Sequence, residues 1–298
     1  MSLSDSCAPL HPDCLDGEIT RLTTRYPALS RRILGRSILG REIPLLLVGK
    51  GKRKLLYVAT HHASEWITSR LLLLFLEDLL RALAAGERPY GLDLGFLLSH
   101  RMLALVPMLN PDGVAIVMGD ESDPLAERRA AMRRGSTASW QANARGVDLN
   151  HNYRVGFAEY KRIEAERGIL GGAPTRYSGS CPESEPETAA LASFVRAAAP
   201  RLVLSLHTQG EEIYYRGGGR ELPGARATAL RLAALSGYRV GEAEGSAAYG
   251  GLCDYTTAAL GIPSFTLECG RGENPLPPTD APTIYRRLRR LFFESIAM

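Results

Sequence analysis

The chain has 298 residues, of which 45% are hydrophobic and 23% are charged. This balance is typical of a globular protein and excludes a disordered chain, a collagen-like repeat and a disulfide-stabilised miniprotein. The 36 Lys and Arg residues only slightly outnumber the 32 Asp and Glu residues. We therefore expect no nucleic-acid partner, whereas a small anionic substrate suits this mild excess. The longest apolar run, residues 71–76, is far too short to span a bilayer.

Cysteine usage and the N-terminus bear on the compartment. The five cysteines are an odd number with no CxxC spacing, which argues against a disulfide framework or a thiolate zinc site and favours a reducing environment. The N-terminus, MSLSDSCAPLHPD, lacks a basic region followed by an apolar one, so we expect no signal peptide and a cytoplasmic location. The start Met1-Ser2-Leu3 is also compatible with a cloning leader, which leaves a removed signal open.

Apolar runs and turn residues predict the elements in chain order. Residues 32–48 form two extended segments around Gly40, which predicts a hairpin at a sheet edge. Strands are expected at 55–60, 102–108, 202–206 and 264–267, and helices at 65–85, 185–198 and 225–236. Strands that alternate with helices favour a largely parallel sheet that is covered on both faces, in one domain.

Two arginine-rich segments have ordinary structural explanations. The stretch 119–179 is predicted to be a long loop, which is either functional or disordered. Its Arg128, Arg129, Arg133 and Arg134 are expected on a solvated face, with guidance of anionic peptides as the alternative. The run YRRLRRLFF at 285–293 places apolar residues and arginines on separate helical stripes. This pattern favours a terminal helix docked on the core over a membrane or nucleic-acid helix.

The sharpest motif is Thr60-His61-His62-Ala63-Ser64-Glu65-Trp66, which lies between an apolar run and a helical segment. His62 and Glu65 are three positions apart across a strand-to-helix turn, so both side chains could reach one metal ion. This spacing also arises by chance, and a histidine held by the turn is the alternative. His61 is out of phase with Glu65, so packing or support is favoured over coordination.

Two further residues with metal-site chemistry end predicted strands. His207 follows the run at 202–206, and Glu268 follows the run at 264–267. Ligands of open α/β sheets bind at the carboxyl ends of the strands, so these residues should meet His62 and Glu65. The sequence therefore predicts a zinc site with two histidines and one glutamate, and a separate glutamate as general base.

From Gly35 to the C-terminus, the sequence resembles the zinc carboxypeptidases of the carboxypeptidase A type. The matching strings are HHASEWIT at 61–68, NPDG at 110–113, GVDLNHNY at 146–153, SEPET at 184–188 and FTLE at 265–268. The resemblance implies an α/β fold with a mixed, roughly eight-stranded twisted sheet flanked by helices. It places a single catalytic domain at 31–298, after an N-terminal segment at 1–30.

The resemblance also implies the chemistry. One Zn²⁺ per chain would be bound by His62, Glu65 and His207. Glu268 would remove a proton from the attacking water and pass it to the leaving amine, with no acyl-enzyme.

Within the family, the strings HTQGEEIY at 207–214 and ENPLP at 273–277 are closest to bacterial γ-D-glutamyl-L-diamino acid peptidases. This implies a peptide substrate derived from the cell wall, cleaved at the γ-D-Glu–diamino acid bond, with Gln209 among the substrate-binding residues. The alternatives are a zinc deacylase of N-acyl amino acids and a non-catalytic module that binds cell-wall peptides. The preferred diamino acid, the endo- or carboxypeptidase mode and the oligomeric state stay open.

Two positions depart from the family pattern near the scissile bond. Gln141 stands where the family has its oxyanion arginine, and Arg145 in the same loop is the expected substitute. His151 stands beside the matching Asn150, where the family has a carboxylate-binding arginine, so a bidentate clamp is lost. Both residues are expected to bind substrate, and a solvated loop position is the alternative for His151.

Two further departures lie in the specificity loop. Ser246 occupies the position of the family's mobile tyrosine, and Tyr249 is close enough in sequence to replace it. Cys253 falls at the floor of the pocket, just before Asp254. A buried and inert thiol is the alternative for this cysteine.

Overall fold

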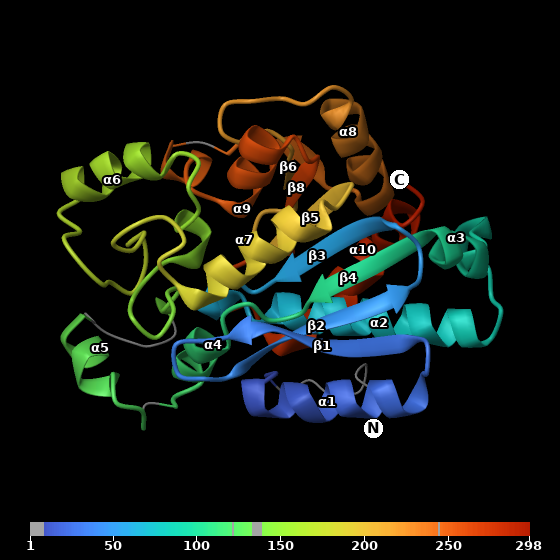
Figure 1. Cartoon of the computed structure of the whole chain (residues 1–298), viewed down its shortest axis with the longest axis horizontal. Helices are drawn as coiled ribbons and strands as arrows, with labels where there is room; N and C mark the ends of the chain where they lie inside the picture. Colours follow the sequence, from blue (N-terminus) through green and yellow to red (C-terminus); the bar gives the residue numbers. More distant parts are fainter. Residues whose placement is uncertain (1–8, 121, 133–138, 244) are drawn as a thin grey trace.

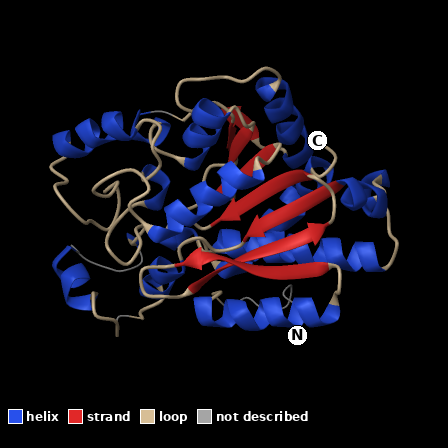
Figure 2. Ribbon diagram, in the orientation of Figure 1, coloured by secondary structure: helices blue, strands red, loops and turns tan. Residues whose placement is uncertain are grey.

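The structure is a computed structural model that describes residues 9–120, 122–132, 139–243 and 245–298. A twisted sheet runs through the molecule, with helices on both of its faces (Figures 1 and 2). In the described residues the sheet has eight strands, in the order β1-β2-β4-β3-β5-β8-β6-β7. They are β1 (Leu29–Arg36), β2 (Glu42–Gly49), β3 (Arg53–Ala59), β4 (Arg101–Val106), β5 (Leu202–His207), β6 (Glu212–Tyr214), β7 (Arg239–Gly241) and β8 (Ser264–Glu268).

The sheet is mixed, which confirms the predicted fold class. The strands β4, β3, β5 and β8 are parallel, and Tyr57 in β3 pairs with Leu105 on one side and Leu204 on the other. The hairpin β1–β2 is antiparallel at one edge, and β6 pairs antiparallel with β8 towards the other. The hairpin and the four central strands lie where the sequence predicts them. The strands β6 and β7 have three residues each and are too short to give an apolar run.

Helices follow most of the strands. They are α1 (Pro12–Arg25), α2 (Ile67–Ala84), α3 (Leu94–His100), α4 (Pro111–Val117), α5 (Ala126–Met132), α6 (Phe157–Glu166), α7 (Pro186–Ala198), α8 (Ala225–Ser236), α9 (Leu252–Asp254) and α10 (Ala281–Ser295). The predicted helices at 65–85, 185–198 and 225–236 correspond to α2, α7 and α8.

The strand β3 shows why both faces of the sheet need helices. Leu55 and Tyr57 belong to the hydrophobic cluster that includes α1, α2, α8 and α10. Leu56 and Val58 belong to the cluster of α7 and α9. Alternate side chains of a strand point to opposite faces, and all four of these are buried. A strand that is covered on both faces is apolar throughout, which explains the unbroken run in this part of the sequence.

The terminal helix α10 packs against α2, so the predicted docked helix is confirmed. Its Leu288 and Phe292 are fully buried, whereas Arg289 forms an ion pair with Asp78 at 2.6 Å. None of the helices in the described ranges is long and apolar enough to cross a membrane.

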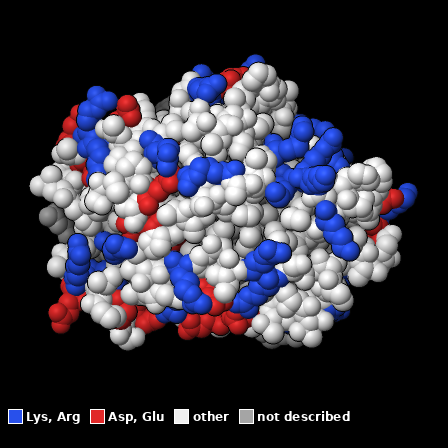
Figure 3. Space-filling model, viewed as in Figure 1, with Lys and Arg blue, Asp and Glu red and all other residues white. Residues whose placement is uncertain are grey.

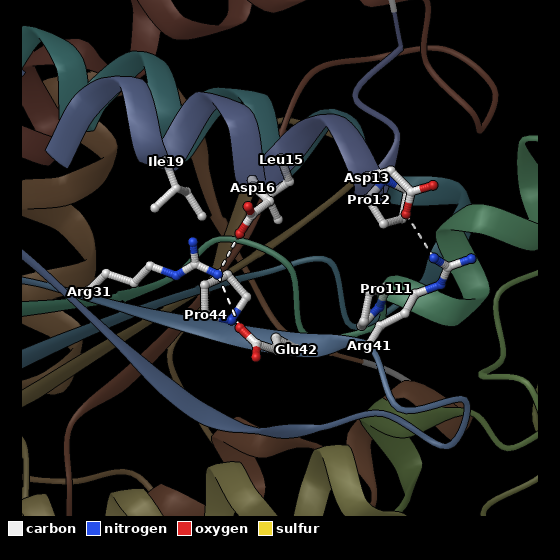
Figure 4. Close-up of a pocket in the computed structure, with 10 residues that line it drawn as sticks. All are labelled: Pro12, Asp13, Leu15, Asp16, Ile19, Arg31, Arg41, Glu42, Pro44 and Pro111. Atoms are coloured by element: carbon white, nitrogen blue, oxygen red, sulfur yellow. Dashed lines mark hydrogen bonds and ion pairs between the residues drawn. The ribbon is translucent and has the colours of Figure 1, made fainter. Parts of the chain in front are cut away.

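The helix α1 is joined to the edge hairpin by ion pairs around a cavity of about 460 Å³ (Figure 4). Arg31 lies between Asp16 and Glu42, at 2.5 and 3.1 Å. Arg41 contacts Asp13 at 2.8 Å. These ion pairs fix α1 on the sheet. Because carboxylates neutralise both guanidinium groups, the cavity offers a ligand neither Arg31 nor Arg41 as an unpaired charge.

The segment 119–179 contains more regular structure than its composition indicates. Both α5 and α6 lie within it, on the side of the molecule to which the arrowheads of β3 and β4 point (Figure 1). Arg128 is exposed, as expected. The prediction for Arg129 is wrong, because this side chain is fully buried and forms an ion pair with Asp123. A buried guanidinium needs such a partner to offset its desolvation.

Part of the sequence-based expectations concerns residues outside the described ranges. These are the N-terminal leader and signal, Cys7, Arg133 and Arg134.

On the face shown in Figure 3, basic and acidic side chains are interspersed.

Candidate metal centre and active site

The turn after β3 directs His62 and Glu65 to the carboxyl edge of the sheet. Thr60 has a positive φ of 58°, and its backbone N–H donates to the Thr68 hydroxyl at 3.1 Å. That hydroxyl donates in turn to the carbonyl of Glu65 at 2.7 Å. These bonds join the end of β3 to the first turn of α2. The short 3-10 turn Ala63–Glu65 lies between the two elements and sets the spacing of the two side chains.

Three side chains from two strand ends converge at one point. Nδ1 of His62 lies 2.9 Å from Oε1 of Glu65, and Nδ1 of His207 lies 3.0 Å from Oε2 of the same carboxylate. The two Nδ1 atoms are 3.3 Å apart. The ligand atoms of all three residues lie within 4.8 Å of one another. Two imidazoles and one carboxylate beside a cavity match a catalytic zinc site that keeps one position for water.

Each imidazole has a second ring nitrogen, Nε2, that does not face the Glu65 carboxylate, and this outer nitrogen has its own polar partner. Nε2 of His62 lies 3.2 Å from Oδ1 of Asp148, and Nε2 of His207 lies 3.2 Å from the hydroxyl of Ser205. With the proton on each outer nitrogen, both Nδ1 atoms present lone pairs to the point that the Glu65 carboxylate also faces. Three electron-pair donors then meet without a hydrogen between them, and a divalent cation fits this arrangement.

The charges of the cluster favour an ionised carboxylate. Burial raises the pKa of Glu65, but the imidazoles of His62 and His207 more than offset this and hold the pKa below its ordinary value. Burial lowers the pKa of His62, but the carboxylates of Glu65 and Asp148 outweigh this effect and raise the pKa. Both directions reflect attraction between imidazole and carboxylate, so Glu65 is available as an anionic ligand.

Glu268 lies beside this cluster on the neighbouring strand. It pairs in parallel register with His207, and both line a cavity of about 210 Å³ together with His62 and Glu65. Burial raises the pKa of Glu268, and the negative charge of Glu65 raises it further. A half-buried carboxyl group with a raised pKa, next to the ligands but outside the ligand group, is suited to general base catalysis.

The other family strings hold the loops that carry these side chains. Asn110 of NPDG donates to the carbonyl of His61 at 3.0 Å. Asn152, which follows Asp148 in the next loop, accepts a hydrogen bond from the hydroxyl of Thr188 in SEPET. Through these contacts the strings position the loops of the metal site, and of their residues only Asn150 and His151, in GVDLNHNY, line the cavity.

His61 packs behind the metal cluster. Its Nε2 lies 3.1 Å from the hydroxyl of Tyr153, and its ring stacks on that of His207 with centroids 5.4 Å apart. Burial lowers the pKa of His61. This position agrees with the predicted supporting role, because the ring lies against a ligand and outside the ligand group.

His151 is buried, so the alternative of a solvated loop residue is wrong. Its Nδ1 donates to the carbonyl of Tyr249 at 2.7 Å, and its ring stacks on Tyr160 with centroids 3.8 Å apart. Burial lowers the pKa of His151. A neutral ring whose Nδ1 is a donor has an acceptor at Nε2, so it cannot act as a cationic clamp for a carboxylate.

Three predicted substrate-binding residues line the cavity. They are Asn150, His151 and Cys253. Burial raises the pKa of the Cys253 thiol to about 12, so this side chain is a neutral part of the wall. The hydroxyl of Thr266 donates to its sulfur at 3.2 Å.

Four other predicted site residues lie outside the lining of this cavity. Gln141 accepts a hydrogen bond from Thr175 at 2.5 Å, and Arg145 lies 3.5 Å from Glu185. Tyr249 supports His151 through its backbone carbonyl, and Gln209 is exposed. Their roles in catalysis and substrate binding stay predictions.

The two strings of the subfamily resemblance meet at the cavity wall. The Thr208 hydroxyl donates to Oδ1 of Asn274 at 2.6 Å, and Nδ2 of Asn274 donates to the Thr208 carbonyl at 3.2 Å. Thr208 lines the cavity. The ENPLP segment therefore holds the start of the HTQGEEIY segment beside His207.

The lining also contains side chains to which sequence reasoning assigned no role in the site. They are Tyr214, Arg216, Asp254, Thr266 and two alanines, Ala243 and Ala247. The first two lie at and just after β6, a strand that only the three-dimensional pairing with β8 brings to the site. The one signal in the sequence for these two residues is the HTQGEEIY string, which ends at Tyr214, two positions before Arg216.

The family model for zinc carboxypeptidases matches residues 16–289. The chain belongs to the zinc carboxypeptidase family. It is therefore a zinc metallopeptidase, with His62, Glu65 and His207 as its zinc ligands and peptides as its substrates.

Relatives of known name match different shares of the chain. It is 34% identical over 283 residues to γ-D-glutamyl-L-diamino acid endopeptidase 1 of Lysinibacillus sphaericus, a match that covers 94% of this chain and 70% of that protein. It is 28% identical to human carboxypeptidase B, over 65% of this chain and 44% of the relative.

Solved structures share the fold. Bovine thrombin-activatable fibrinolysis inhibitor matches with a TM-score of 0.75 at 19% identity, over 98% of this chain and 97% of that chain. Murein-tripeptide amidase MpaA from Escherichia coli O157 matches with a TM-score of 0.50 at 20% identity, over 90% of both chains.

Proposed function

We propose that this zinc peptidase hydrolyses the bond between γ-linked D-glutamate and a diamino acid in peptides derived from the bacterial cell wall. The observation that carries the proposal is the match along 94% of the chain to an endopeptidase named for this bond. Two local features agree with it. The subfamily strings meet at the cavity wall, and the cavity has a neutral histidine where the family resemblance predicts an arginine.

The presence of His151 argues against an ordinary carboxypeptidase, which binds the free C-terminal carboxylate of its substrate. A guanidinium binds a terminal carboxylate through two parallel hydrogen bonds, and a neutral imidazole offers neither the charge nor the second donor. Recognition then depends more on other groups of the substrate. A γ-linked D-glutamate keeps a free α-carboxylate beside the scissile bond, and a diamino acid adds polar groups at its far end.

The residues of the cavity divide the chemistry. A bound zinc ion supplies Lewis-acid activation of water. Glu268 takes a proton from the attacking water and delivers it to the amine of the departing diamino acid. Asn150 and His151, which line the same cavity as the ligands, hold the substrate there.

The alternatives are less well supported. A non-catalytic binding module has no need for a complete ligand group with an additional glutamate beside it. A deacylase of N-acyl amino acids would use the same metal chemistry, so a substrate comparison distinguishes it.

The test compares kcat/KM for four substrates with zinc-loaded protein. They are L-Ala-γ-D-Glu-L-Lys, its α-linked isomer, an apolar α-linked dipeptide and an N-acyl amino acid. We expect efficient hydrolysis of the γ-linked peptide alone. His151→Arg should raise kcat/KM for the apolar dipeptide, and His100→Arg, at an exposed histidine of α3, should not. Efficient wild-type cleavage of the apolar dipeptide without a response to His151→Arg would overturn the proposal, and preference for the N-acyl amino acid would indicate a deacylase.

A further inference from the structure

The wall of the catalytic cavity contains one permanent positive charge. Arg216 is the single Arg or Lys among the described residues that line it. The lining also contains the carboxyl groups of Glu65, Glu268 and Asp254. The first two belong to the metal site and the base. The third is held within the protein, because it accepts hydrogen bonds from the N–H groups of Gly218 and Gly251 at 2.7 and 2.9 Å.

The backbone that carries Arg216 is fixed on both sides. The strand β6, which ends at Tyr214, pairs with β8. Just after Arg216, Gly217 pairs with Arg220, and Asp254 binds the N–H of Gly218. The guanidinium therefore extends from an anchored turn, and its place on the wall does not depend on a free loop.

The partners of the Arg216 side chain are exposed carboxylates. Its Nη1 lies 3.1 and 3.2 Å from the two oxygens of Glu242, and its Nε lies 4.0 Å from Glu221. The side chains of Glu242 and Glu221 are 56% and 40% exposed. Ion pairs in water contribute little to stability, so a carboxylate of a substrate inside the cavity can replace them at low cost. A guanidinium has five N–H donors, and a pair with Glu242 through Nη1 leaves several of them unused.

We propose that Arg216 forms a carboxylate-binding subsite for the distal end of the diamino acid. The subsite selects a residue with a second carboxylate, such as 2,6-diaminopimelate, over lysine, which has the distal ammonium group but no carboxylate beside it. The inference rests on the proposed function, because it assigns the diamino acid to this cavity. It names the diamino acid that the sequence leaves open.

The geometry separates this role from catalysis. Arg216 is outside the ligand group, and the base is Glu268 on β8. Arg216 would contact a part of the substrate distant from the scissile bond. The effect of its loss on kcat/KM should therefore depend on whether the substrate has the distal carboxylate. If Arg216 had a general structural or catalytic role, its loss would lower kcat/KM equally for all substrates.

The test uses two peptides that differ at the distal carboxylate, L-Ala-γ-D-Glu-diaminopimelate and L-Ala-γ-D-Glu-L-Lys. We expect the wild type to prefer the first. Arg216→Gln should lower kcat/KM for it by about 10- to 100-fold, the range for loss of a charge-assisted hydrogen bond, and should leave the lysine peptide unchanged or slightly better. Arg216→Lys should restore part of the preference.

The matched control is Arg220→Gln. Arg220 lies in the same turn but donates to the carbonyl of Ala258 at 2.8 Å and is not part of the cavity lining. This variant should keep the wild-type preference. Equal hydrolysis of the two peptides by the wild type, or equal losses on both in Arg216→Gln, would overturn the subsite.

A binding measurement distinguishes failure of the subsite from failure of the proposed bond. Free diaminopimelate and free lysine are each titrated into zinc-loaded protein by calorimetry. Tighter binding of diaminopimelate, lost in Arg216→Gln, supports the subsite even if neither peptide is cleaved, and in that case the proposed bond is wrong. Equal binding of the two amino acids overturns the subsite whichever bond is cleaved.

Discussion

Asp148→Asn should weaken zinc binding although Asp148 is not a ligand. Its Oδ1 lies 3.2 Å from the outer nitrogen of His62, and the carboxylate also accepts the backbone N–H groups of Asn150 and Arg176 at 3.3 and 3.1 Å. The side chain is buried, so water cannot replace it. Asparagine has nearly the same shape, but it lacks the charge that orients the imidazole and increases its basicity.

The expected loss follows from this contact. Removal of a carboxylate partner from a metal-binding histidine costs about 10- to 100-fold in metal affinity, or about 1.4 to 2.8 kcal/mol. The assay is competition for zinc with a chromophoric chelator, which gives the dissociation constant of each variant.

The control is Asp112→Asn, at a second buried carboxylate. Asp112 accepts hydrogen bonds from the Ser37 hydroxyl and the Leu39 N–H, each at 2.8 Å, and has no contact with a ligand. This variant should lose stability but keep its zinc affinity within about twofold. Wild-type zinc affinity in Asp148→Asn, or an equal loss of affinity in both variants, would show that the contact between Asp148 and His62 does not support the metal site.

Three further predictions concern catalysis, packing and pH. Glu268→Gln should keep stoichiometric zinc in metal analysis but lose on the order of 10²-fold or more in kcat, because an amide cannot accept the proton of water; turnover within a few-fold of wild type would place the base elsewhere. Phe292→Ala, in the fully buried face of α10, should lower the free energy of unfolding by about 3 to 5 kcal/mol in denaturant titrations. Phe96→Ala, at a side chain that is 61% exposed, should change it by less than about 0.5 kcal/mol, and equal effects would contradict the docking of α10. Burial raises the pKa of Glu187 from 4.5 to about 8, so the folded state keeps a proton that the unfolded chain releases. The free energy of unfolding should then fall as pH rises between these values, by at most about 1.4 kcal/mol per unit, and a Glu187→Gln variant with the same slope as the wild type would exclude this group as the cause.

The metal site was predictable because its residues follow buried parallel strands. A strand covered on both faces gives an apolar run that is easy to recognise, and the polar residue after it lies at the carboxyl edge of the sheet. His62, His207 and Glu268 all satisfy this condition. Their convergence therefore follows from the topology, whereas the distances of about 3 Å between ligand atoms also need the turn that spaces His62 and Glu65.

The part of the cavity wall around Arg216 was not predictable, for the opposite reason. Arg216 follows a strand of three residues whose place beside β8 depends on tertiary pairing, so no periodic pattern indicates its position. The burial of Arg129 depends on the partner Asp123, six positions earlier, which composition cannot identify. The burial of His151 depends on stacking with Tyr160 from α6, a helix within a segment that appeared to be a loop. In each case the missing information is a contact between segments.

The most direct test of the account is product analysis by mass spectrometry in ¹⁸O-labelled water. Zinc-loaded wild type and Glu268→Gln are incubated with L-Ala-γ-D-Glu-diaminopimelate. We expect the wild type to release free diaminopimelate and L-Ala-D-Glu with one ¹⁸O atom in the γ-carboxylate, and the variant to release almost none. An intact peptide in the presence of zinc-loaded wild type, or a label in the carboxylate of alanine, would contradict this expectation.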